Sequence, residues 1–130
     1  KNLLAQFSSL FPNLRLSGHA RKNIETLSGN EEFFREFMRH LSVLSDTAYE
    51  WEKGTKFMPK GIDCSNETKN TLARYRDKHT FICDDGKARL FSSHSKIRSA
   101  NQRIYFFHDS AEGIVHIGHA GEHLPTVKYH

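Results

Sequence analysis

The stretch RIYFFHDSAEGIVHIGH, residues 103–119, carries the clearest strand pattern in the chain. Two of its runs, Arg103–His108 and Ile114–Ile117, are rich in aromatic and β-branched residues, which favour β-strands. The residues between them, Asp109–Gly113, include polar turn formers and end in glycine. The pattern therefore predicts a β-hairpin with two antiparallel strands and a short turn.

A second hairpin is predicted just upstream. His79–Cys83 and Lys87–Ser92 have strand-like sequences, and the Asp84–Gly86 turn between them ends in Asp-Gly, a pair that suits tight hairpin turns. The next segment, Ser93–Gln102, is polar and basic, so we predict a connector between the two hairpins. The C-terminal part of the chain thus holds four predicted strands in two consecutive hairpins.

The N-terminal part follows the period of an α-helix instead. We predict helices over residues 2–11, 19–27, 30–44 and 67–77, joined by loops over residues 13–17 and 55–65. Residues 46–53 either extend the third helix or form another helix after it. At the start of the third helix, Ser28 and Glu31 have the spacing of a capping box. The apolar stripe of this helix is formed by Phe33, Phe34, Phe37, Met38, Leu41 and Leu44.

This order of elements predicts an α+β fold in which N-terminal helices pack on a C-terminal four-stranded, mainly antiparallel sheet. We expect a single domain, because 130 residues suit one hydrophobic core. Residues 1–78 form its helical part, residues 79–123 its sheet and residues 124–130 a tail. Because the chain begins with Lys1 rather than methionine, we expect it to be part of a longer protein.

The composition favours an anionic partner over a membrane. The formal net charge is +4, and a basic surface attracts nucleic acid, although soluble domains with other partners also carry such a charge. No apolar run is long enough to span a bilayer. Cys64 and Cys83 form no CxxC motif, so we predict reduced thiols in a cytoplasmic protein. Two aspartates follow Cys83 and raise its pKa, which argues against a nucleophilic role.

Histidines gather in the last third of the chain. His116, His119 and His123 are spaced by three and four residues, and His94 and His108 lie upstream. Histidine nitrogens are common zinc and iron ligands, so a metal site is one hypothesis. However, His116 falls on a predicted strand and His119 in a glycine-flanked turn, and no carboxylate–histidine metal motif accompanies them. We therefore predict polar histidines at a sheet edge, with no metal and no cofactor.

A second group of candidate residues is basic: Lys87, Arg89, Lys96, Arg98 and Arg103, with Tyr105 and the nearby histidines. Strand alternation places Lys87 and Arg89 on one face, and Arg103 with Tyr105 on one face of the later strand. If the two faces coincide, the cations hold a phosphodiester while tyrosine or histidine transfers protons. The alternative is a set of ordinary charged side chains on the solvent face of an antiparallel sheet.

The same region, residues 86–123, resembles the RelE/ParE superfamily of bacterial toxins. The resemblance rests on Gly86-Lys87-Ala88-Arg89-Leu90, Arg103-Ile104-Tyr105-Phe106-Phe107, the turn residue Asp109, the strand Ile114–Ile117 and the Gly118-His119 exit. It implies N-terminal helices packed on a curved antiparallel sheet. RelE-like members cleave mRNA, often on the ribosome, without a metal, and ParE-like members poison DNA gyrase instead. Basic and aromatic residues of the RelE-like sheet activate the ribose 2′-hydroxyl and stabilise the phosphate.

Carried over to this chain, the resemblance implies that Lys87, Arg89 and Arg103 contact phosphate and that Tyr105, His94 or His119 transfers protons. Lys96 and Arg98 of the connector are further candidates for binding RNA. The expected function is then a metal-independent endoribonuclease toxin of the bacterial cytoplasm. Its expected partners are RNA, including ribosome-bound mRNA, and a small antitoxin that covers the basic face.

Two other functions stay open. One is a binding module without enzymatic activity, which recognises nucleic acid or, like ParE, a protein target. The other is a metal site built from the histidines. Salt-sensitive binding without cleavage would favour the first of these, and stoichiometric metal in the purified protein would favour the second.

Overall fold

The computed structural model describes residues 3–128, so the predicted helix start at Asn2 and the end of the predicted tail lie outside it. The fold is α+β, as predicted, with one five-stranded sheet whose strand order is β1–β7–β6–β5–β2. These strands are β1 (Leu14–Leu16), β2 (Asp63–Asn66), β5 (Ser93–Ile97), β6 (Gln102–Asp109) and β7 (Ile114–Gly121). The sheet is mainly antiparallel, and only β1 runs parallel to its neighbour, β7.

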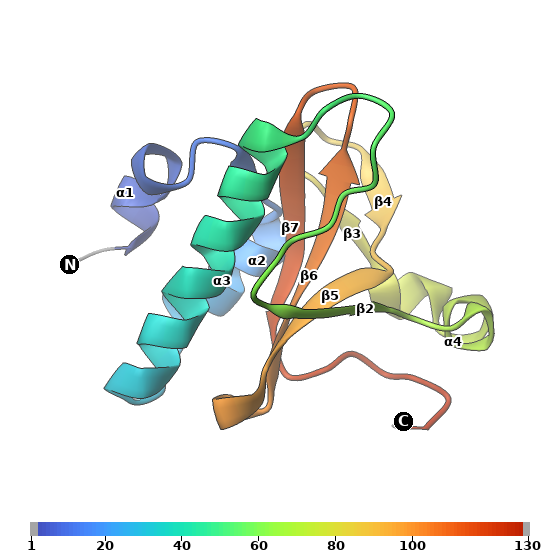
Figure 1. Ribbon diagram of the computed structural model, residues 1–130. Coiled ribbons are helices and arrows are strands. Elements are labelled where there is room, and N and C mark those ends of the chain that lie inside the picture. Colours follow the sequence, from blue (N-terminus) through green and yellow to red (C-terminus); the bar gives the residue numbers. More distant parts are fainter. Residues whose placement is uncertain (1–2, 129–130) are drawn as a thin grey trace.

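Four α-helices accompany the sheet: α1 (Leu3–Leu10), α2 (Gly18–Glu25), α3 (Glu31–Glu50) and α4 (Lys69–Arg74). The longest, α3, lies across one side of the sheet (Figure 1). Its buried Phe37 and Leu41 share one hydrophobic core with Ile104 and Phe106 of β6, and each such side chain contributes about 1.5–3 kcal/mol on burial. No helix within residues 3–128 has the length and apolar character needed to cross a membrane.

The third predicted helix exists, but its N-cap differs from the predicted one. The predicted N-cap at Ser28 is wrong, because the side chain of Asn30 accepts the hydrogen bond from the Phe33 N–H at 2.8 Å and caps the helix. Asn30 has the extended backbone of a cap residue, which brings its side chain within reach of that N–H. Of the two alternatives for residues 46–53, the extension is confirmed, because the helix continues without a break to Glu50.

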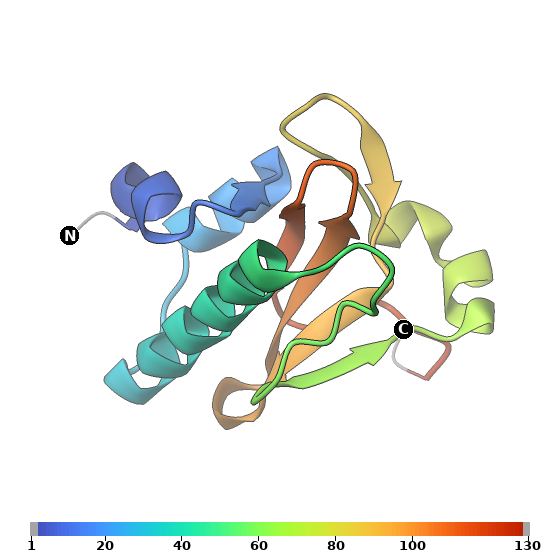
Figure 2. The same ribbon diagram turned by 45° about the horizontal axis from the view of Figure 1, so that its top comes forward.

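The first predicted hairpin is present but does not belong to the main sheet. Its strands, β3 (Thr80–Ile82) and β4 (Ala88–Leu90), form a separate two-stranded sheet on the side of the main sheet opposite α3 (Figures 1 and 2). Gly86 has a φ of +85° in the turn, a conformation that glycine adopts without strain. A 3₁₀ turn, Arg76–His79, leads into this hairpin from α4.

Three predicted connectors contain strands instead. Ser93–Gln102 contains β5 and a short 3₁₀ turn (Arg98–Ala100), residues 13–17 contain β1, and residues 55–65 contain most of β2. The prediction failed at β5 because two of its three buried residues, His94 and Ser95, are polar; the Ser95 hydroxyl is 2.9 Å from Nδ1 of His40. A hydrogen-bonded pair of polar residues replaces the apolar alternation that marks most strands.

A β-bulge interrupts the pairing of the two central strands. Tyr105 pairs with His119, but the next residue, Phe106, pairs with Ile117, so Gly118 is the extra residue on β7. The bulge turns both His116 and His119 toward the side of the sheet that carries β3 and β4, although their spacing of three would otherwise place them on opposite faces. That side is called the outer face below.

Replacing Gly118 with alanine is expected to destabilise the fold by about 1–3 kcal/mol, the usual range for overpacking a core. A Cβ at this position would lie 2.9 Å from three ring carbons of Phe91, which is fully buried. The matched control is Gly18→Ala at the start of α2, where a Cβ would meet nothing within 4 Å. Urea denaturation of both variants measures the difference, and equal stabilities would contradict the close packing of Phe91 on the bulge.

Candidate functional site

The candidate site is a pocket of about 260 Å³ on the outer face of β5 and β6. The C-terminal segment closes one side of it, where the Val127 N–H donates to the Thr71 hydroxyl of α4 at 3.2 Å. We call it the Tyr105 pocket, and its main lining residues are Glu67, His94, Lys96, Arg103, Tyr105 and Lys128. Arg103, Tyr105, His94 and Lys96 were all predicted as site residues, and the structure brings these four together.

Tyr105 is fully buried at the floor of this pocket. Its hydroxyl donates to Oε2 of Glu67 at 3.1 Å and accepts from the Leu124 N–H at 3.1 Å. Burial, with a smaller effect of Glu67, raises the pKa of the Tyr105 phenol well above its usual range. Tyr105 therefore stays protonated and holds Glu67 in place, which suits a positioning residue better than an acid or base.

His94 stands beside Tyr105, with ring centroids 4.9 Å apart, and its side chain is almost completely buried. Its Nε2 lies 3.1 Å from the Ser65 hydroxyl. Burial, followed by the positive charges of Arg103 and Lys96, lowers the pKa of His94 to about 4. The ring is therefore neutral at pH 7 and retains a nitrogen that can accept a proton.

The contact between His94 and Glu67 is consistent with that neutral ring. Nδ1 of His94 lies 3.4 Å from Oε2 of Glu67 but lacks the geometry of a hydrogen bond. It is therefore a close polar contact rather than an ion pair. If His94 gained a proton, Glu67 would be the nearest group able to stabilise its positive charge.

Two cations face each other at the rim of the pocket. Lys96 of β5 and Arg103 of β6 are direct cross-strand partners, an arrangement that like charges disfavour. Within residues 3–128, neither forms an ion pair; Asp63, which lies opposite Lys96 on β2, is bound by Arg98 instead. An anion placed between Lys96 and Arg103 would relieve their repulsion, so the rim has the character of an anion-binding site.

Arg89 and Lys87, two other predicted phosphate contacts, line a different pocket of about 630 Å³. The Arg89 guanidinium donates to both carboxylate oxygens of Asp85, at 2.9 and 2.8 Å, and lies 3.4 Å from Asp109. Asp109 ends β6, whereas Arg103 lies near its start, so six residues of strand separate them by about 20 Å. The predicted meeting of Arg89 with Arg103 is not observed, because the hairpin that carries Arg89 docks over the far end of β6.

The surroundings of Arg89 indicate that its side chain links the two-stranded sheet to the main sheet. The guanidinium lies over the ring of Phe107, 5.7 Å from its centroid, and the Arg89 side chain is only 13% exposed. Behind it, Nε2 of the buried His116 is 3.3 Å from the same Asp109 carboxylate. Hydrogen bonds, mainly those to Asp85, raise the pKa of Arg89 further above its usual high value, so the guanidinium stays charged.

Replacing Arg89 with methionine is expected to lower the free energy of unfolding by about 2 kcal/mol, because its hydrogen bonds to Asp85 are lost and Asp109 loses its arginine partner. The arrangement of the Tyr105 pocket should not change, since Arg89 does not line it. Urea denaturation checks the loss of stability, and NMR chemical shifts of the His94 and Tyr105 rings check the pocket. Normal stability of the Arg89→Met protein would contradict the role of Arg89 as a link between the two sheets.

The remaining predicted site residues lie around the Tyr105 pocket rather than in it. The ring of His119 is 5.8 Å from that of Tyr105, its Nε2 donates to the Glu122 carbonyl at 2.8 Å, and its Nδ1 lies 2.9 Å from Nε2 of His19. Because a carbonyl only accepts, the His119 Nδ1 accepts from His19. Arg98 is exposed and donates to Asp63.

The predicted histidine spacing does not produce a shared centre. His116 faces Asp109, His119 faces His19, and Nδ1 of His123 lies 3.1 Å from the Leu124 carbonyl. Within the described part of the chain, no three histidine, cysteine, aspartate or glutamate side chains converge as metal ligands. The metal hypothesis therefore has no preformed site within residues 3–128.

Both cysteines are poor nucleophile candidates. Burial raises the pKa of Cys64 to about 11. The predicted rise in the pKa of Cys83 is confirmed, although burial contributes more to it than the adjacent Asp85 and Asp84. Neither thiol is therefore expected to ionise readily near pH 7.

Sequence reasoning missed two residues that shape the Tyr105 pocket. Glu67 follows β2, whereas the sequence pattern predicts the start of a helix there, and its role depends on β2 pairing with β5. His79 is fully buried, its Nε2 donates to the Pro125 carbonyl at 2.8 Å, and its ring lies 5.7 Å from that of Tyr105. No local pattern could reveal either contact, because both join segments at least 38 residues apart.

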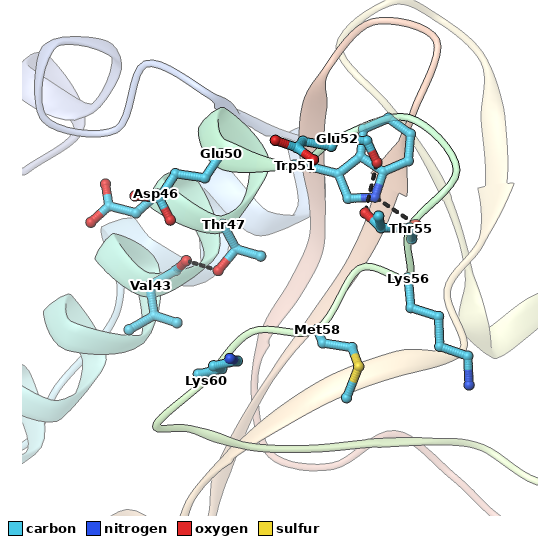
Figure 3. A pocket seen from close by; sticks show the side chains of 10 residues that line it. All are labelled: Val43, Asp46, Thr47, Glu50, Trp51, Glu52, Thr55, Lys56, Met58 and Lys60. Atoms are coloured by element: carbon cyan, nitrogen blue, oxygen red, sulfur yellow. Dashed lines mark hydrogen bonds between the residues drawn. The ribbon is translucent and has the colours of Figure 1, made fainter.

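A pocket of about 680 Å³ at the C-terminal end of α3 is a weaker candidate (Figure 3). Its charged residues carry both signs, and Figure 3 shows them spread around the rim rather than pointing to one spot. The Trp51 indole N–H already donates to the Thr55 carbonyl at 2.8 Å. The buried ring nitrogens without a hydrogen-bond partner, within residues 3–128, belong to histidines that do not line this pocket.

No protein-family model, curated protein or solved structure matches the chain. The chemistry of the Tyr105 pocket is therefore the main guide to function. It combines the opposed cations Lys96 and Arg103, which form no ion pair within residues 3–128, with a neutral imidazole and a carboxyl group held by a buried tyrosine. Such a set can bind a phosphate and move a proton without a metal.

Proposed function

We propose that the protein is a RelE-like bacterial toxin, a metal-independent endoribonuclease that cleaves mRNA. One observation carries the proposal: the opposed cations Lys96 and Arg103 lie in the same pocket as His94, a buried imidazole that is neutral at pH 7. Cations that meet a phosphate and an imidazole that accepts a proton are the two requirements for RNA cleavage by its own 2′-hydroxyl.

In the proposed reaction, the scissile phosphate lies between Lys96 and Arg103. His94 takes the proton of the adjacent ribose 2′-hydroxyl, and the O2′–P bond forms while the P–O5′ bond breaks. The leaving O5′ takes a proton from water or from His123, which also lines the pocket. The products are a 2′,3′-cyclic phosphate and a 5′-hydroxyl end, and the two cations stabilise the charge that grows on the phosphate oxygens.

Substrate binding would itself strengthen His94 as a base. Arg103 and Lys96 contribute to the lowered pKa of His94, after burial. A phosphodiester bound between them offsets their charge, so the pKa of His94 rises when RNA binds. Glu67, held by Tyr105 at 3.1 Å, then stabilises the protonated ring.

The fold and the resemblance agree with this proposal. Helices α1, α2 and α3 share one core with a mainly antiparallel sheet, which suits the helix-on-sheet packing that the RelE/ParE resemblance implies. The proposed catalytic groups lie on the outer face, next to α4. The proposed partners are those of RelE-like toxins: mRNA, including mRNA on the ribosome, and a small antitoxin that covers the basic outer face. It also places the protein in the cytoplasm.

The alternative is a binding module without enzymatic activity, such as a ParE-like gyrase inhibitor. Tyr105 favours it, because a phenol that is fully buried and bonded at both its donor and acceptor positions cannot reach a substrate. In this case Lys96 and Arg103 bind an anionic partner and no bond is broken.

The test is cleavage of end-labelled mRNA by the purified protein in EDTA, with and without ribosomes. We expect fragments that end in 2′,3′-cyclic phosphate, and growth arrest when the protein is expressed alone. Binding that weakens steeply with salt and leaves the RNA intact would favour the alternative. Absence of both cleavage and growth arrest would overturn the proposed enzyme.

A further inference from the structure

We propose that a second pocket, on the α3 side of the sheet, binds a nucleobase of the RNA strand whose phosphate lies in the Tyr105 pocket. This second pocket has a volume of about 450 Å³, and we call it the His108 pocket. Its main lining residues are Phe57, Met58, Ile62, Ser65, Asn66 and His108. The inference rests on the proposed function and assigns the part of the substrate next to the phosphate.

The two pockets meet across the edge of the sheet. β2 is the edge strand and is only four residues long. Ser65 and Asn66, at its end, line both the Tyr105 pocket and the His108 pocket. An RNA strand that crosses this edge can therefore place a phosphate in the Tyr105 pocket on the outer face and a neighbouring base in the His108 pocket on the α3 side.

His108 supplies the first specific feature of the pocket. Its ring is stacked on Phe57, with centroids 4.2 Å apart and planes 20° apart, and meets the Trp51 ring edge-on at 4.8 Å. Its Nε2 is buried and has no hydrogen-bond partner within the described residues. This nitrogen is covered in the free protein, and an unpaired buried polar atom costs about 1–3 kcal/mol, so a ligand whose polar edge displaced the covering atoms would gain a bond there.

The rest of the lining fits a base better than a second phosphate. Phe57, Met58 and Ile62 offer apolar walls, and Met58 is 63% exposed, so it can cover a bound ring without first leaving the core. Lys56 is the only charged lining residue of this pocket within residues 3–128. Flat apolar surface with few charges matches the stacking surfaces that hold single-stranded bases.

Asn66 offers a polar edge to such a base. Its Oδ1 accepts from the Ser93 hydroxyl at 2.7 Å, which orients the amide. Its side-chain nitrogen has no partner within the described residues and can donate to a base. Amide side chains pair with base edges through their donor and acceptor groups, so Asn66 is the residue expected to influence which base binds.

The experiment uses NMR titration of the intact chain with the four nucleoside monophosphates and with ribose 5-phosphate, which has the phosphate but no base. We expect each favoured nucleotide to bind about fivefold or more tightly than ribose 5-phosphate, as one stacked base provides. Its binding should shift the side-chain amide of Asn66 and the methyl group of Met58. Equal affinities for all five ligands, without these shifts, would overturn the base site and leave the proposed phosphate site intact.

Variants separate this inference from the proposed function. Met58→Ala should weaken nucleotide binding about fivefold and leave ribose 5-phosphate unaffected, because Met58 lines the His108 pocket and not the Tyr105 pocket. The matched control is Tyr49→Ala, since Tyr49 is 80% exposed and lies outside the pocket. Lys96→Ala should weaken the binding of ribose 5-phosphate and the binding of the nucleotides by the same factor. If the nucleotides bind and ribose 5-phosphate does not, the base site stands and the phosphate site is removed. If none of the five ligands binds, both sites are overturned.

Discussion

Replacing Arg103 with alanine is expected to lower kcat for RNA cleavage by about 100-fold or more, the usual effect of removing a group that stabilises developing charge. Within residues 3–128, Arg103 forms no ion pair that its loss would break, and it shares the Tyr105 pocket with Lys96 and His94. Thermal unfolding should therefore change little. Arg103→Lys should restore part of the activity, because a point charge can replace some of the guanidinium's contacts.

The matched control for Arg103 is Arg98→Ala. Arg98 carries the same charge, is followed within five residues by Arg103, and has a side chain that is 76% exposed and bound only to Asp63. Removing such a surface pair should change stability by at most about 1 kcal/mol and cleavage by less than about threefold. Equal losses in both variants would indicate general electrostatic attraction of RNA rather than a placed catalytic cation, and full activity of Arg103→Ala would remove Arg103 from the site.

The sequence predicted the strand pairs that depend on local patterns. The aromatic run in residues 103–108 and the apolar run in residues 114–117 are β6 and β7, although β7 continues to Gly121. The Asp-Gly turn of the upstream hairpin is also confirmed, with Gly86 in the conformation that such turns require. In both cases the partner strands are adjacent in the chain, so turn chemistry and alternation were enough.

Strands with distant partners or polar cores could not be predicted in this way. β1 has only three residues, and it pairs with β7 about one hundred residues later. β5 buries His94 and Ser95, whose polar groups are satisfied by Ser65 and His40. Ile97 is the one apolar residue among the three buried positions of β5, and a single apolar residue gives no hydrophobic period to detect.

The candidate site was predicted only in part, because local patterns place residues on a strand face but do not show how separate segments pack. Arg103 and Tyr105 were placed on one face by strand alternation, and both line one pocket. Arg89 could not be placed, because the sequence does not show that its hairpin forms a sheet of its own over the end of β6. Whether Arg103 and Tyr105 act in catalysis stays a prediction.

Acid is expected to destabilise the protein between pH 6.5 and pH 4, before most carboxyl groups titrate. Burial lowers the pKa of His94 from 6.5 to about 4, and burial lowers the pKa of His119 to about 4 as well. An unfolded chain would protonate both rings near pH 6.5, whereas the folded protein keeps them neutral until about pH 4. The stability from each is therefore complete above pH 6.5 and lost as the pH falls toward 4.

The size of the loss follows from the change in pKa. For His94, whose pKa falls from 6.5 to about 4, the free energy of unfolding should drop by about 3 kcal/mol across this range. The buried His40 and the partly buried His108, whose pKa values burial also lowers, add to the same loss. Carboxyl groups with lowered pKa values, such as that of Asp85, extend it at still lower pH.

Urea denaturation at several pH values between 7.5 and 4 measures this loss, and NMR titration of the His94 ring locates its pKa. His94→Gln should be less stable at pH 7.5 but lose less stability on acidification, because the glutamine side chain does not titrate. A bound phosphate should oppose the effect, since its charge offsets Arg103 and Lys96 and raises the pKa of His94. Stability that stays level from pH 7 to pH 5, or a His94 pKa near 6.5, would mean that the ring is open to water and not the poised base of the proposed reaction.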